Sequence, residues 1–503
     1  MADIPRDPPR TLLETLSCLG PGIILASAIV GSGELIATTT VGAEAGFVLL
    51  WLIVMGCAIK VAAQVEIGRA TLVRGRTPLV TFDAVPGPRF AGRGWIYWGW
   101  VAMVLLVVVQ QGGILLGVAQ TLAAGVPLTQ EGREWNRVRD GVAATRIAEA
   151  AARRGGDAER ADALHVRFAK LEAEATTLVK PTDETAWAVV TAIVTSALLA
   201  IGRYRVIERV SLVLVAAFVG VTLLAVVMLQ FDPAWAISST ELASGLVPSI
   251  PPKVGGRSPL VTALATFGII GVAAGELMIY PYWCLEKGYG RAVGPRDDSQ
   301  AWADRARGWI RVLQCDAWIS MIVYTTVTVA FYLLGAATLG RLGLLPAGDE
   351  MVRSLGAMYH PVFGGWADDV FLVGAFAVLY STLFAVADGN SRIVGDGLVL
   401  AGVLPGDEAS RRTWTRRIAC AWPLVALVLG LAIREPVGMV LASGAAQAIM
   451  LAAIGVAVLF LRYDAVDRRL VPSKAWDAFL WISSAGLVAV GLWTAWQRLA
   501  LLL

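Results

Sequence analysis

The sequence contains few charged residues for its length. Of 503 residues, only 16% are charged and 57% are hydrophobic, and the mean hydropathy is +0.66. About a quarter of the residues of a typical soluble domain are charged, so this composition excludes an ordinary soluble protein. The apolar runs are long enough for membrane-spanning helices, and the sequence therefore predicts an all-α polytopic membrane protein.

The residue groupings that enzymes need are also missing. There are only two histidines, His165 and His360, and both fall between the apolar runs. No His-Glu-x-x-His zinc motif, phosphate-binding loop, Cys-x-x-Cys pair or Gly-x-Ser-x-Gly nucleophile motif occurs in a suitable context. We therefore expect no enzymatic activity and no cofactor. The expected partners are the lipid bilayer and a small cargo, and no nucleic acid.

Neither a disulfide framework nor a cleaved signal is expected. The number of cysteines is odd, and each lies in or beside an apolar run, as small core residues do: Cys18, Cys57, Cys284, Cys315 and Cys420. The first ten residues, "MADIPRDPPR", lack the basic region, short apolar core and cleavage site of a secretory signal.

Eleven segments are long and apolar enough to cross a hydrocarbon layer of about 30 Å. They are approximately 14–41, 46–68, 95–125, 185–202, 207–229, 259–284, 312–338, 366–388, 416–433, 436–461 and 475–500. Basic residues collect in alternate loops, which predicts a cytoplasmic N-terminus and a C-terminus outside, in the inner (plasma) membrane. The short loops assigned to the outside hold only Lys253, Arg257, Arg341, Arg353 and Arg434.

One outside loop, residues 128–184, is long and rich in both signs of charge. Leu164, Phe168 and Leu171 recur at helical spacing, and Gly155 and Gly156 stand between two helical patterns, so an amphipathic helical hairpin is expected. It reads either as a solvated hairpin on the outer face or as a lid or partner site. The chain then divides into spans 1–3 (1–127), the hairpin (128–184), spans 4–10 (185–461) and span 11 (462–503).

Two glutamates are the best candidates for the functional site. Glu34, in "VGSGELIA", and Glu276, in "AAGELMIY", lie near the middle of the first and sixth spans. A carboxylate inside the bilayer costs a few kcal/mol and usually marks a functional site. The preceding glycines weaken the helix, and freed backbone groups at such breaks contact ions or substrate in transporters with inverted repeats. We therefore expect the spans to unwind at "GSG" and "AAG", bringing the two glutamates together near the midplane.

A structural role for these residues is the alternative. A membrane glutamate can clamp two helices through a hydrogen bond, and glycines can simply permit close packing. Other polar residues of the spans are weaker candidates, read as interhelical hydrogen bonds or helix caps: Gln110, Gln111, Gln447, Asp388 and Asn390.

Two segments resemble the Nramp divalent-metal transporters. The stretch "GPGIILASAIVGSGELIATTTVGAEAGFVLLWLIV", residues 20–54, is similar to that family's first two spans, and "GRYRVIERVSLVLV", residues 202–215, is similar to the entry into its fifth span. The resemblance covers most of the chain outside 128–184. It implies a LeuT-like fold, in which spans 1–5 and 6–10 form inverted repeats with broken helices 1 and 6.

Several family residues are replaced here. The family's Asp-Pro-Gly-Asn motif falls on Gly31 to Glu34, and its Met-Pro-His motif falls on Ala273 to Gly275, so the metal-binding aspartate and the soft thioether are absent. The acidic residues of its third span fall on Gln111 and Ile114. Together the resemblance and the substitutions imply weak or absent proton coupling and a site of oxygen ligands, which favours a hard divalent cation such as Mg²⁺ or Mn²⁺.

The leading prediction is thus an Nramp-related secondary transporter that imports a divalent metal cation. Glu34 and Glu276 are the predicted metal ligands, and the wider substrate site comprises Gly31, Ser32, Ile270, Ala273 and Gln447. Two alternatives stay open, namely a LeuT-like transporter of an organic cation or amino acid, and a non-transporting membrane sensor or scaffold.

Overall fold

The computed structural model describes residues 5–22, 30–201, 205–253, 258–464 and 467–500, and most of them are helical. Within these residues, nine helices are long and apolar enough to cross a membrane. They correspond to α4 (Leu50–Arg74), α6 (Trp95–Gly125), α9 (Asp183–Ile201), α10 (Arg205–Met228), α15 (Gln300–Leu334), α18 (Ala367–Leu400), α19 (Glu408–Ile433), α20 (Pro436–Tyr463) and α21 (Lys474–Ala500). The predicted all-α membrane fold is confirmed.

The first and sixth predicted spans are interrupted. Within the first, the described residues form the π-helix η1 (Gly33–Thr38) and α3 (Thr39–Ala45), while its residues 23–29 lie outside the described part. The sixth consists of α12 (Pro259–Phe267) and α13 (Ala274–Glu286). Nine uninterrupted helices and two interrupted segments are compatible with eleven spans, and that total stays a prediction.

Short elements connect the long helices. The helical ones are α1 (Leu12–Cys18), α5 (Pro78–Asp83), η2 (Leu229–Phe231), α11 (Ser239–Leu246), α14 (Tyr289–Val293), η3 (Gly335–Gly340), η4 (Gly348–Glu350), α16 (Met351–Gly356), η5 (Ala357–Tyr359), α17 (His360–Phe363), η6 (Gly364–Trp366) and η7 (Arg468–Leu470). Strands β1 (Arg89–Phe90) and β2 (Arg93–Gly94) form an antiparallel pair in which Arg89 lies opposite Gly94.

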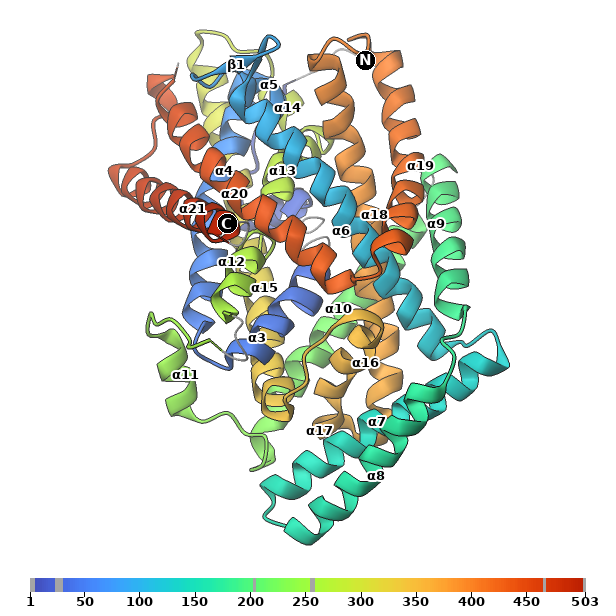
Figure 1. Cartoon of the computed structure of the whole chain (residues 1–503). Helices are drawn as coiled ribbons and strands as arrows, with labels where there is room; N and C mark the ends of the chain where they lie inside the picture. Colours follow the sequence, from blue (N-terminus) through green and yellow to red (C-terminus); the bar gives the residue numbers. More distant parts are fainter. Residues whose placement is uncertain (1–4, 23–29, 202–204, 254–257, 465–466, 501–503) are drawn as a thin grey trace.

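The connections alternate between the two ends of the bundle. Figure 1 shows β1, α5 and α14 at the end where the described chain begins, and α7, α8, α11 and α17 at the other end. Successive long helices therefore run in opposite directions, as in a chain that crosses a bilayer repeatedly.

Apolar helices surround a buried centre. The long helices fall into two groups by the buried share of their most apolar stretch. That share is 61–78% in the inner group, α4, α6, α20 and the segments containing α15 and α18, and only 28–39% in the outer group, α9, α10, α19 and α21. The outer helices nevertheless remain strongly apolar, with mean hydropathies of 1.6 to 3.0. Such apolar outward surfaces are expected of helices that face lipid.

Residues 130–177 form a helical hairpin at the end away from the N-terminus (Figure 1). Its helices, α7 (Gln130–Arg154) and α8 (Ala158–Thr177), are joined by a turn at Gly156, where φ is +77°. Polar contacts fasten the hairpin to the bundle. Arg353 Nε donates to Asp140 over 2.8 Å, and Arg154 donates to the Ala234 carbonyl over 3.0 Å.

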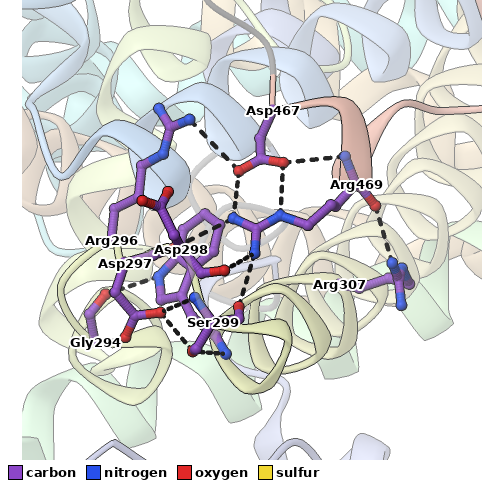
Figure 2. Close-up of polar contacts among 9 residues, drawn as sticks. Gly294, Arg296, Asp297, Asp298, Ser299, Arg307, Asp467 and Arg469 are labelled. Carbon is purple, nitrogen blue, oxygen red and sulfur yellow. Dashed lines mark hydrogen bonds and ion pairs between the residues drawn. The ribbon is translucent and has the colours of Figure 1, made fainter.

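A cluster of polar contacts around Asp467, with Arg296 and Arg469, lies at the end where the described chain begins. Figure 2 shows Arg469 donating through Nε and Nη2 to the Asp467 carboxylate, at 3.0 and 2.8 Å, with Arg296 at 3.4 Å. Arg469 also donates to the Ser299 carbonyl, which joins the loop after α20 to the start of α15. The Arg469 contacts lower the pKa of Asp467 to about 2, so this carboxylate is ionised at neutral pH.

Candidate cation site

The break between α12 and α13 covers Gly268 to Ala273. Gly271 has φ +55°, in the left-handed region that glycine adopts without strain. A side chain at Gly268 would collide with the carbonyl of Gly444 on α20, so the break also packs backbone against backbone. The expectation that "AAG" would unwind is wrong, because Ala274 and Gly275 already belong to α13. The unwinding occurs instead around the left-handed Gly271.

The described part of the first break packs against the second. Val30 and Gly31 form a turn before η1. A Cβ added to Gly33 would lie 2.8 Å from the Ile269 carbonyl, and one added to Gly31 would overlap the Thr382 side chain of α18. The absence of side chains at these glycines therefore lets the two breaks meet inside the bundle. Short π-helical stretches such as η1 often occur at functional sites.

The Glu34 carboxylate joins the two breaks. Its side chain is fully buried. Oε2 accepts the Gly31 N–H over 3.4 Å, and Oε1 accepts the Gly271 N–H over 3.3 Å and lies 3.2 Å from the Thr328 hydroxyl of α15. Both oxygens thus have protein partners.

The Glu276 carboxylate is less completely bonded. Glu276 lies in the first turn of α13, where the positive end of the helix dipole stabilises a negative charge. Its Oε2 is buried and has no hydrogen-bond partner among the described residues. No hydrogen bond between described atoms links Glu276 directly to Glu34. An unpaired carboxylate oxygen in a protein interior is costly, and it provides a point at which a cation can bind.

A chain of neutral polar groups connects the two breaks by another route. Gln110 on α6 donates to Ser32 over 3.1 Å and accepts from Ser443 and Gln447 of α20, over 2.8 and 3.1 Å. Gln447 Oε1 in turn accepts the N–H of Gly275, over 3.1 Å. This network brings the predicted site residues Ser32 and Gln447 together beside Glu276.

Of the two adjacent glutamines on α6, Gln110 is the one that faces the breaks. Gln111, the position at which the family resemblance places an acidic residue, is fully buried. Both of its amide atoms lack a hydrogen-bond partner within the described part of the chain.

The weaker candidates Asp388 and Asn390 lie toward the end of α18. Asp388 pairs with Arg392, and Asn390 donates to the Val386 carbonyl.

Sequence reasoning missed Lys60. This α4 residue is fully buried, and its Nζ donates to the carbonyls of Phe267 and Ile270, over 2.5 and 2.7 Å. Its charge interacts with those of both Glu34 and Glu276. The signal was present in the sequence, since Lys60 is a charged residue within the second apolar run. The Ile270 carbonyl, predicted as a cargo ligand, is therefore already bonded.

The ligands near the breaks are mostly oxygen atoms. Within the described ranges, no group of three or more His, Cys, Asp or Glu residues could hold a metal ion. One thiol comes close, because a Cβ on Gly271 would lie 3.2 Å from Cys57 Sγ. The arrangement can thus offer two carboxylates, hydroxyl and amide oxygens and backbone carbonyls to a cation, with the Lys60 ammonium nearby.

Solved structures with a similar fold support this layout. The chain aligns with a mutant of the manganese transporter of Eremococcus coleocola, with a TM-score of 0.55, 17% identity, and coverage of 98% of this chain and 90% of the other. The same transporter bound to an aromatic bis-isothiourea compound gives a TM-score of 0.53 at 17% identity, over 98% and 90%. MhsT in complex with L-phenylalanine gives 0.51 at 15% identity, over 97% and 99%. These likenesses confirm the LeuT-like fold.

The family follows from the sequence itself. No curated protein matches the chain. A family model described as "Natural resistance-associated macrophage protein-like" matches residues 172–497, which is more than half of the chain. The chain therefore belongs to the Natural resistance-associated macrophage protein-like (Nramp) family and is a membrane transporter, not an enzyme.

Proposed function

We propose that this transporter imports a hard divalent cation, Mg²⁺ or Mn²⁺, and that Glu276 is its principal ligand. The observation that carries the proposal is the buried Oε2 of Glu276, which has no hydrogen-bond partner among the described residues. Inside a bilayer such an oxygen needs a cation or a proton. Membership of the Nramp family and the fold shared with a manganese transporter support a divalent metal as cargo.

The other ligands are proposed from their position. Glu34 supplies the second carboxylate, and Gly31, Ser32, Ala273 and Gln447 line the two breaks beside it. Ile270 is left out of this set because its carbonyl already accepts a hydrogen bond from the Lys60 ammonium. Magnesium commonly keeps several waters and needs only one or two carboxylates, so a pair of glutamates is a sufficient set of charged ligands.

We further propose that transport is weakly coupled to protons or uncoupled. Gln111 and Ile114 stand where the family resemblance places acids, and both are buried. His165 and His360 lie in α8 and α17, outside the long membrane helices. Neither of these two imidazoles can therefore relay protons through the centre of the bundle.

The proposed orientation places the N-terminus in the cytoplasm of a cell whose plasma membrane holds the protein. The basic loops on the N-terminal side favour this orientation. The 128–184 hairpin and the C-terminus would then lie outside.

A second candidate cargo is a small organic ammonium ion. If Glu34, Glu276 and Lys60 are all charged, they carry together one net negative charge. One negative charge matches a monovalent cation better than a divalent one. The carbonyls at the break already bind one ammonium group, that of Lys60.

Flux into proteoliposomes tests both candidates. We expect the parent to take up Mg²⁺ or Mn²⁺. The affinity of Glu276→Gln for the divalent cation, read from the concentration dependence of uptake, should be at least about tenfold lower, equivalent to about 1.4 kcal/mol of binding. Glu408→Gln is the control, because the Glu408 side chain is 79% exposed and forms an ion pair with Arg412, one turn away on the same helix. An acid-outside pH gradient should leave the rate nearly unchanged. Uptake of methylammonium without divalent uptake would favour the second candidate, and absence of all three fluxes would contradict both.

A further inference from the structure

The Lys60 ammonium occupies an unusual position for a buried basic group. Its two hydrogen-bond acceptors, the carbonyls of Phe267 and Ile270, belong to the last residue of α12 and to the break that follows. Its Nζ also lies 4.9 Å from the centre of the Phe267 ring. Its hydrogen-bond partners among the described residues are these two carbonyls and not a carboxylate. Backbone carbonyls and an aromatic face therefore make the direct contacts of this charge, while Glu34 and Glu276 act on it electrostatically without a hydrogen bond.

The carboxyl end of a helix attracts cations for a general reason. The last carbonyls have no intrahelical partner and carry the negative end of the helix dipole. In transporters with broken helices, unwound carbonyls and half-helix carboxyl ends are where coupling ions bind. An ammonium nitrogen in direct contact with two such carbonyls occupies the kind of position that a dehydrated alkali cation would take.

We propose that Lys60 is a tethered cation, whose ammonium fills a monovalent-cation position at the carboxyl end of α12. The transporter therefore needs no dissociable alkali cation at this position. This inference concerns the α12 end alone and does not depend on which cargo is carried.

Two features distinguish this role from that of an ordinary helix cap. A cap usually comes from the helix itself or from the loop after it, whereas Lys60 reaches α12 from α4, more than two hundred residues away in sequence. The adjacent Thr266 has a buried hydroxyl without a partner among the described residues. Removal of the ammonium would thus leave two carbonyl oxygens available to a small cation.

The test is the thermal stability of the purified full-length protein in different chloride salts. We expect the Tm of the parent to be the same in sodium, potassium and choline chloride at equal ionic strength. Lys60→Ala opens the position, so its Tm should fall by several degrees in choline chloride. Sodium or potassium should restore much of that loss with a saturable dependence on concentration, because choline is too large to enter.

Lys60→Met is the matched control. Its side chain fills a similar volume without any N–H donor, so its Tm should fall and no alkali salt should restore it. If Lys60→Ala behaves in the same way, Lys60 is only a structural cap and the inference is wrong.

A second variant covers the case in which Lys60→Ala does not fold in any salt. Lys60→Gln keeps an N–H donor and removes the charge, and its shorter side chain leaves the carbonyls partly open. A higher Tm in sodium or potassium than in choline would support the inference, and equal values would overturn it. Because this readout is stability and not flux, it can fail while the proposed cargo stands, and the reverse also holds.

Discussion

The same tripeptide, Gly-Glu-Leu, follows each of the two helix breaks, but its carboxylate is bound differently in the two places. In the first, both oxygens of Glu34 have partners, including the N–H of Gly271 from the other break. In the second, Oε2 of Glu276 has no partner among the described residues. Glu34 follows a turn and points across to the sixth-span break, whereas Glu276 lies in the first turn of α13 itself.

This difference suggests a division of roles between two residues that look equivalent in sequence. Glu34 connects the breaks and so fixes their relative position. Glu276 has an unpaired oxygen, which is the one proposed to bind the cargo. Lys60, which interacts electrostatically with both carboxylates, limits the net negative charge that they present together. A cation that binds at Glu276 would therefore meet a site already positioned by Glu34.

The largest loss of stability and uptake is expected from straining the backbone between α12 and α13, which Gly271→Ala should do. The new residue would have to adopt φ +55°, and its Cβ would lie 2.9 Å from the Tyr324 ring. Left-handed backbone and overpacking together should cost on the order of 3 kcal/mol. We expect a large fall in Tm and loss of uptake, measured by thermal unfolding and by proteoliposome flux.

Gly75→Ala is the matched control for backbone strain alone. Gly75, at the end of α4, has φ +61° and ψ +25° and nothing within 4 Å of the added Cβ. It should cost only the left-handed penalty of about 1 kcal/mol. Equal losses of stability in the two variants would show that packing at the break contributes nothing, and would weaken the assigned link between Gly271 and Glu34.

The sequence predicted the helices better than it predicted the contacts between them. The predicted span 95–125 coincides with α6, because a long apolar run bounded by polar residues fixes where a membrane helix lies. The position of the sixth-span break was missed by several residues, since three neighbouring glycines could all have unwound and only tertiary packing selects Gly271. The contacts of Lys60 could not be predicted, because its partners are backbone carbonyls more than two hundred residues away, and no sequence pattern encodes such a contact.

The comparison of the two glutamates is sharpened by their glutamine variants. Both substitutions remove one buried charge. Glu34→Gln also turns an acceptor that faces Gly31 or Gly271 into an N–H₂ donor, which leaves a backbone N–H unpaired. Glu276→Gln disturbs no such bond at Oε2. We expect Glu34→Gln to be less stable than Glu276→Gln by about 1–3 kcal/mol, measured by thermal unfolding without added divalent cation.

Calorimetric titration with Mg²⁺ and Mn²⁺ completes that comparison. Glu276→Gln should lose more affinity than Glu34→Gln, because the unpaired oxygen is the one proposed to bind the cation. If Glu34→Gln is the more stable variant and also loses more affinity, the roles assigned to the two residues are reversed.

The smallest expected effect concerns the neutral network that joins the breaks, and it compares Gln110 with its neighbour Gln111. Gln110→Leu leaves Ser32, Ser443 and Gln447 without their shared partner. The Gln110→Leu substitution should lower the free energy of unfolding by about 1–2 kcal/mol, since neutral hydrogen bonds are worth about 1 kcal/mol each and the serine hydroxyls can rotate to other acceptors.

Gln111→Leu is the matched control, with a similar volume change. It removes amide atoms that have no partner among the described residues, so its Tm should be equal to or higher than that of the parent. Thermal unfolding of the two variants side by side measures the difference. If Gln111→Leu proves the more damaging of the two, the polar connection between the breaks runs through Gln111, the position at which the family resemblance places an acidic residue.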